Sequence, residues 1–226
     1  MPSTATEDRI STRSSRQAIA LRVGTTAAAL AIWFWSQSLI GARALPVTGI
    51  GDWTHAATAF ANHYLLTHTT SANALLIVSS AIIDLMGLFL LGRWLLQGQA
   101  RPFLALLVVL GLRQVMQALV ALPPPPNEIW RSPGFPSLLV TYGVSNDFFF
   151  SAHTAIAVLA ATELVRYGKR RLLALAILLV AFEIATVLVL RAHYVMDVFT
   201  GLITGLYAAH LADRLSTRLN ASRSPH

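Results

Sequence analysis

Residues 171–190 read RLLALAILLVAFEIATVLVL, a run in which Arg171 and Glu183 are the only charged side chains. A segment of this length and apolar content is typical of a helix that crosses the hydrocarbon core of a bilayer, which is about 30 Å thick. The preceding run, 150–167, and the following run, 195–213, have a similar character. We therefore expect three consecutive membrane helices in this half of the chain.

Three more apolar runs lie toward the N-terminus, which gives six expected spans. They are 21–42, 73–96, 102–122, 150–167, 171–190 and 195–213. Hydrophobic residues make up 55% of the chain and charged residues only 12%, about half of the share in soluble domains. The sequence predicts an all-α fold, a polytopic membrane helix bundle of about six transmembrane helices. Its expected parts are a polar segment, 1–20, a six-span membrane domain, 21–213, and a basic tail, 214–226.

The net charge of +7 is carried mainly by short segments between the apolar runs. This placement is typical of a membrane protein that fixes its topology with basic loops, so we expect no nucleic-acid partner. The basic segments precede the first span, separate the second from the third and the fourth from the fifth, and follow the sixth. Both termini are therefore expected in the cytoplasm. The absence of cysteine excludes disulfides, thiolate metal sites and cysteine nucleophiles.

Two polar segments are expected at the outer membrane face, SNDFFFSAHT at 145–154 and RAHYVMD at 191–197. His193 and Asp197 are four residues apart, a spacing that puts them on one face of a helix. A carboxylate there can orient the imidazole and leave its other nitrogen free to attack, although this spacing alone also fits a helix-surface pair. His153 supplies a second imidazole, which could protonate a leaving oxygen. Together they suit phosphoryl transfer.

The pattern DFFFSAHT, followed about forty residues later by RAHYVMDV, resembles the sphingomyelin synthase family, within the type 2 phosphatidic acid phosphatase superfamily. That family's pattern is roughly C-G-D-x-x-x-S-G-H-T and then H-Y-T-x-D-V. The basic segment 166–171 and the stretch 112–123 are also similar to the family, and the resemblance covers about residues 84–213.

The resemblance implies a six-helix fold with its active site at the exoplasmic or periplasmic face. It implies a phosphohistidine intermediate on His193, oriented by Asp197, with His153 acting first as acid and then as base. Asp147 falls on the family's motif aspartate, and neither a metal nor another cofactor is expected.

The chain also departs from the family patterns. Ala152 replaces the glycine of S-G-H-T, and Val195 replaces the threonine of H-Y-T. The superfamily's K-x₆-R-P motif is missing, and Val187 stands where an arginine precedes the nucleophilic histidine. The phosphate site must then be built differently, and we expect Arg191 and Arg113 to bind phosphate with help from Ser151.

The predicted function is a membrane lipid phosphotransferase that moves a phospho-head group from a glycerophospholipid to a lipid alcohol such as ceramide. Two alternatives stay open: a lipid phosphate phosphatase with water as acceptor, and a non-catalytic membrane protein. The expected partners are membrane lipids. Neither the head group nor the oligomeric state follows from the sequence.

Charged residues inside the apolar runs need partners in the bundle interior. We expect Asp84 to pair with Arg113, and Glu183 to be a hydrogen-bonded core carboxyl. Three histidines of the first outer connection are expected to be solvated: His55, His63 and His68.

Overall fold

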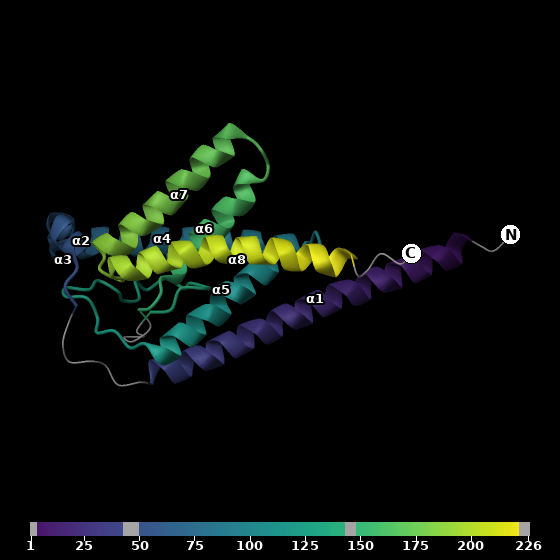
Figure 1. Ribbon diagram of the computed structural model, residues 1–226, viewed down its shortest axis with the longest axis horizontal. Coiled ribbons are helices and arrows are strands. Elements are labelled where there is room, and N and C mark those ends of the chain that lie inside the picture. The colour runs from purple at the N-terminus through teal and green to yellow at the C-terminus, as the bar shows by residue number, and fades with distance from the viewer. Residues whose placement is uncertain (1–3, 43–49, 143–147, 222–226) are drawn as a thin grey trace.

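The computed structural model describes residues 4–42, 50–142 and 148–221, and over these ranges it contains helices and no strands (Figure 1). The helices are α1 (Thr4–Gly41), α2 (Trp53–Ala57), α3 (Ala59–Thr67), α4 (Thr69–Leu95), α5 (Ala100–Leu119), α6 (Ala152–Val165), α7 (Arg170–Val189) and α8 (Val195–Ala221). The predicted all-α membrane bundle is therefore confirmed. The short helices α2 and α3 were not predicted, and they lie in the connection between α1 and α4.

Five helices in the described part of the chain are long and apolar enough to cross a membrane. They are Ser15–Gly41 of α1, α4, α5, α7 and Val195–Leu219 of α8. The expected span 150–167 corresponds to α6, which has 14 residues and is therefore only about 21 Å long. The membrane domain was expected to span 21–213. α1 begins before this range, at Thr4, and α8 ends after it, at Ala221.

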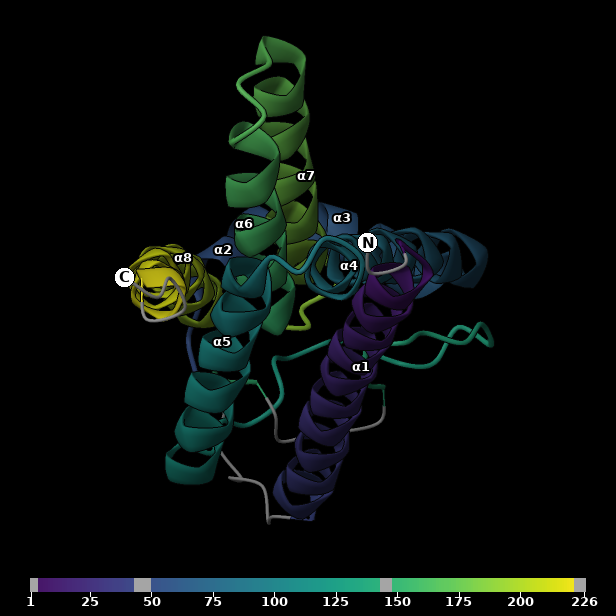
Figure 2. The same ribbon diagram turned by 90° about the vertical axis from the view of Figure 1, so that its right-hand side faces the viewer.

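The centre of the bundle is α6, which contacts α4, α5, α7 and α8. Most of its side chains are buried, so neighbouring helices rather than lipid cover its surface. The main core cluster joins α6 to α4, α5 and α8 and includes Ile83, Val109, Leu159 and Ala208. Figure 2 shows α6 and α7 side by side, extending away from α5 and α1.

Two glycines allow α8 to approach α6 closely. A Cβ atom on Gly201 would lie 2.5 Å from the carbonyl oxygen of Ser151, and one on Gly205 would lie 3.0 Å from that of Ala155. Only a residue without a side chain fits such contacts, as in other closely packed membrane helices. The packing holds the first turns of α6 and α8 together at one end of the bundle. We call this the motif end, because both histidine motifs lie there.

Candidate active site

Ser151 fixes the start of α6. It is the N-cap residue, and its hydroxyl oxygen accepts hydrogen bonds from the Thr154 backbone N–H (3.3 Å) and the Thr154 hydroxyl (3.1 Å). Its own N–H donates to the carbonyl oxygen of Asp197 in α8, at 3.1 Å. An N-cap serine satisfies N–H groups that a helix leaves unpaired at its start. Ser151 therefore positions His153 in the first turn of α6 and joins it to the segment that carries His193.

Asp197 lies in the first turn of α8, where a negative charge is favoured by the helix dipole. Its carboxylate Oδ2 accepts the N–H of Tyr194 at 2.9 Å and lies 3.6 Å from Nδ1 of His193. The side chain of Asp197 is fully buried. His193 precedes the helix, so the two meet across the turn that begins α8 rather than along one helix face. The nitrogen of His193 that does not face Asp197 is Nε2.

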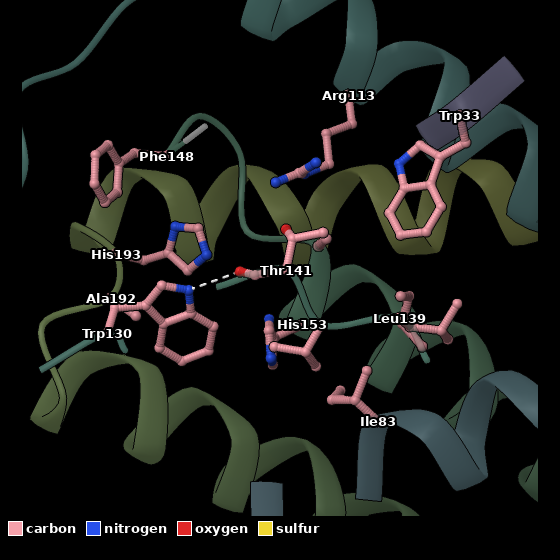
Figure 3. Close-up of a pocket in the computed structure, with 13 residues that line it drawn as sticks. Trp33, Ile83, Arg113, Trp130, Leu139, Thr141, Phe148, His153, Ala192 and His193 are labelled. Atoms are coloured by element: carbon pink, nitrogen blue, oxygen red, sulfur yellow. Dashed lines mark hydrogen bonds between the residues drawn. The ribbon is translucent and has the colours of Figure 1, made fainter. Parts of the chain in front are cut away.

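The two motif histidines line one cavity, together with Arg113 and the aromatic side chains of Trp33, Trp130 and Phe148. Figure 3 shows both imidazoles and the guanidinium group directed into the same space. The cavity volume is about 30 Å³, which is room for about two water molecules. Surrounding side chains must therefore move if a larger ligand is to bind.

His153 is held from one side by Trp130. Their rings meet edge to face with centroids 5.1 Å apart, and the indole N–H of Trp130 donates to the carbonyl oxygen of Thr141 at 3.1 Å. Nε2 of His153 is buried and has no hydrogen-bond partner within the described ranges. An unpaired buried polar atom costs about 1–3 kcal/mol, so a reacting group that bonds to this nitrogen would be favoured.

Arg113 brings a buried positive charge to the cavity. Its Nη1 donates to the side-chain oxygens of Gln37 (3.1 Å) and Gln117 (3.2 Å), and its Nε donates to the carbonyl oxygen of Phe150 (3.3 Å). The acceptors come from α1, α5 and the segment before α6, so the guanidinium group is fixed in place. This position suits an anionic ligand.

The expected pairing of Asp84 with Arg113 is wrong. The carboxylate of Asp84 accepts the N–H groups of Leu138 (2.8 Å) and Leu139 (2.9 Å) and the hydroxyl of Ser137. Asp84 thereby fixes the segment whose next residues line the cavity.

Arg191, the second arginine expected at the phosphate, lies outside the cavity lining. Its two Nη atoms donate to the carbonyl oxygens of Pro126 (2.7 Å) and His55 (3.0 Å). Its φ of 55° is in the left-handed region, which is uncommon for a residue with a side chain and turns the chain between α7 and α8. Arg191 therefore holds connections together at the motif end.

His55 is buried, so the expectation that it is solvated is wrong. Its Nε2 lies 3.0 Å from the carbonyl oxygen of His193, a contact in which Nε2 must carry the proton and donate. The sequence gives no sign of this role, because His55 reaches a residue far along the chain. His63 and His68 are exposed, as expected.

Asp52 lies beside the contact between His55 and His193 and bonds to the start of α8. It is the N-cap of α2, where its Oδ1 accepts the Thr54 N–H at 2.8 Å, and its Oδ2 accepts the N–H of Val195 at 2.5 Å. Burial raises the pKa of Asp52, but the hydrogen bonds from Thr54 and Val195 and the nearby His55 outweigh this effect and leave the pKa below its ordinary value. An aspartate before a short helix is a recognisable N-cap signal.

Two further expectations concern carboxyl groups. Asp147 lies outside the described residues. Glu183 is fully buried in α7, where its Oε2 accepts the hydroxyl of Ser79 at 2.6 Å, as expected for a hydrogen-bonded core carboxyl. Within the described ranges, no group of three or more His, Asp or Glu side chains could hold a metal ion.

The part of the chain that contains both histidine motifs is similar to a known protein family. A family model described as AtPDCT1/2 matches residues 51–214. Phosphatidylcholine:diacylglycerol cholinephosphotransferase 1 of Arabidopsis thaliana is 25% identical to the chain over 137 residues. The alignment covers 61% of the chain but 44% of that relative, so the chain matches less than half of the relative's length. No solved structure matches the chain.

Proposed function

Because the chain belongs to the AtPDCT1/2 family, we propose that it is a membrane lipid phosphotransferase that moves phosphocholine from phosphatidylcholine to a lipid alcohol of the diacylglycerol type. The observation that carries this proposal is the cavity that His153, His193 and Arg113 line together. The resemblance of the two histidine motifs to those of sphingomyelin synthases supports a shared mechanism of head-group transfer. Ceramide therefore stays a second candidate acceptor.

The first chemical step forms a covalent intermediate on His193. Nε2 of His193 attacks the phosphorus, and the bond from phosphorus to the diacylglycerol oxygen breaks. The phosphate anion of the bound donor favours the protonated imidazole of His153. His153 then gives its proton to that oxygen, so diacylglycerol leaves as a neutral alcohol. The phosphorylated imidazole of His193 becomes cationic with a proton on Nδ1, and the carboxylate of Asp197 stabilises that charge.

The second step reverses the first with a new alcohol. His153, now neutral, accepts the hydroxyl proton of the acceptor while the hydroxyl oxygen attacks the phosphorus. The nitrogen–phosphorus bond breaks, and both histidines return to their starting protonation states. No atom or electron beyond donor and acceptor is needed.

The rest of the cavity suits a phosphocholine group. Arg113 supplies positive charge for the phosphate oxygens, and its neighbours keep its guanidinium group oriented. The aromatic rings of Trp33, Trp130 and Phe148 can contact a quaternary ammonium ion, which aromatic faces attract. Ser151 and Arg191 position these groups rather than touch the phosphate.

Purified protein in liposomes tests the proposal. We expect fluorescent diacylglycerol to become fluorescent phosphatidylcholine when unlabelled phosphatidylcholine is supplied. Fluorescent sphingomyelin formed from fluorescent ceramide would identify ceramide as the acceptor instead. Release of inorganic phosphate and diacylglycerol from phosphatidate, with no new phospholipid, would support the phosphatase alternative. Inactivity in all three assays would support a non-catalytic protein.

The mechanism has its own matched variants. His193→Ala should abolish transfer, because it removes the nucleophile. His63→Ala removes an exposed histidine of the first outer connection and should leave transfer unchanged. If His193→Ala retained wild-type turnover, the proposed intermediate would be wrong.

We also propose that both termini are cytoplasmic and that the motif end faces the exoplasmic or periplasmic side. The basic segments support this orientation. A reporter fused after Arg170 should be cytoplasmic, and one inserted after Gly134 should be external. The opposite result would overturn the orientation while leaving the chemistry untouched.

A further inference from the structure

A groove runs between α1 and α5 beside the cavity that holds the histidines. Its volume is about 380 Å³, and its lining includes Thr25, Ala28, Ile32, Leu107, Gly111 and Gln114. α1 lies at the outside of the bundle beside α5 and α4 (Figures 1 and 2). Most of its span is exposed, so the groove that it lines faces the surroundings of the bundle. In a membrane, this groove is open to lipid from the side.

The groove and the histidine cavity adjoin at Trp33. Trp33 lines both spaces. A smaller apolar cavity between them shares Ala29 and Leu107 with the groove, and Leu139 and Ile156 with the histidine cavity. One indole ring therefore separates a lipid-facing groove from the proposed reaction site.

The groove is polar at the end that lies level with Arg113 and mostly apolar along the rest of its length. At the level of Arg113, the side-chain oxygen of Gln114 and the indole nitrogen of Trp33 are buried and have no hydrogen-bond partner in the described part of the chain. A glycerolipid offers both a donor and acceptors near its glycerol: a free hydroxyl in diacylglycerol and ester oxygens in every such lipid. Such groups suit one unpaired acceptor and one unpaired donor.

The length of the groove matches one leaflet. From Ser36 to Thr25, α1 rises about 16 Å, and half of a bilayer's hydrocarbon core is about 15 Å. An acyl chain that descends from a glycerol group at the level of Arg113 would follow the groove along this length. A larger groove between α6, α7 and α8 does not fit as well, because its charged residues, Arg166 and Asp213, lie at the opposite end of the bundle. It also shares no lining residue with the histidine cavity.

We propose that the α1–α5 groove binds an acyl chain of the glycerolipid substrate while the head group or hydroxyl lies in the histidine cavity. This inference rests on the proposed transferase function. Trp33 moves aside or rotates when the lipid is bound, and the weakly packed α1 allows that movement.

Two glycines give a matched test. A Cβ atom on Gly111, in the groove, meets nothing within 4 Å, and the same is true of Gly92, near the opposite end of α4. Gly111→Phe therefore adds a ring at a position that lines the groove and has open space at its Cβ atom, and Gly92→Phe adds the same side chain elsewhere. The measurement is the ratio of kcat/KM for dioleoylglycerol to kcat/KM for a short-chain, water-dispersible diacylglycerol.

We expect Gly111→Phe to lower this ratio about tenfold, because the short chains do not use the full groove. Gly92→Phe should leave the ratio unchanged. An unchanged ratio in Gly111→Phe, or an equal fall in both variants, would overturn the proposal.

Photocrosslinking separates this inference from the transferase function, because it needs no turnover. Phosphatidylcholine with a photoreactive group in one acyl chain is bound to the full chain carrying His193→Ala, and labelled residues are found by mass spectrometry. We expect labels within 25–36 and 107–114, and about a fivefold loss of those labels when Gly111→Phe is added. Labels confined to α6, α7 and α8 would overturn the groove assignment.

Discussion

Asp197→Asn should lower the transfer rate while leaving lipid binding unchanged. At 3.6 Å, and with an effective dielectric constant of about 20, a carboxylate and an imidazolium attract each other by about 4–5 kcal/mol. This attraction acts only when His193 becomes cationic, so the ground state does not share it. The asparagine amide dipole retains part of the stabilisation, and we expect a net loss of about 3 kcal/mol, or about 10²-fold in kcat.

The variant should fold, because an asparagine oxygen can still accept the N–H of Tyr194. The assay is transfer of phosphocholine to fluorescent diacylglycerol in liposomes, with kcat and KM measured separately and thermal unfolding as a check on the fold. Asp213→Asn is the matched control, because Asp213 is on the same helix but bonds to Arg166 at the opposite end. A kcat for Asp197→Asn within about threefold of wild type, with normal folding, would refute the reasoning.

Three further predictions concern the segments that position the site. Asp84→Ala removes the acceptor of the Leu138 and Leu139 N–H groups, so we expect a loss of about 2–3 kcal/mol in unfolding free energy, measured by thermal unfolding, and reduced transfer. His55→Ala removes the hydrogen bond to the carbonyl oxygen of His193 and should lower kcat about tenfold at constant KM, whereas a change in KM alone would contradict this. In the folded chain the pKa of Asp52 lies below its ordinary value of 3.8. The ionised carboxylate therefore stabilises the fold fully at pH values above 3.8, and this stabilisation is lost as the pH falls through the lowered pKa. The difference in thermal midpoint between wild type and Asp52→Asn should therefore shrink below about pH 4, and a constant difference would contradict the account.

The membrane helices could be predicted from the sequence because each is one continuous apolar run. The expected span 171–190 and helix α7 (Arg170–Val189) differ by a single residue at each end. His153 and His193 could be expected near each other, because two polar motifs begin helices at the same end of an alternating bundle. Their convergence on one cavity depends in addition on the close packing of α8 against α6 at Gly201 and Gly205.

Contacts between distant connections could not be predicted in this way. Asp84 bonds to residues more than fifty positions away, and His55 reaches His193 across 138 positions. Neither partner leaves a local pattern, because a backbone N–H or carbonyl group is present at almost every residue. Arg191 shows the same limit, since its charge suggested phosphate whereas its donors bind two carbonyl groups.

The most direct test of the account is to isolate the covalent intermediate. The protein is incubated with phosphatidylcholine and no acceptor, quenched under alkaline conditions that preserve phosphohistidine, and analysed by peptide mass spectrometry. We expect phosphocholine on His193, and we expect its removal when diacylglycerol is added before the quench. His153→Ala should not accumulate this adduct, because the leaving oxygen then lacks its proton donor. A protein that transfers the head group and carries the adduct on another residue, or that carries no adduct at any time point, would contradict the central claim.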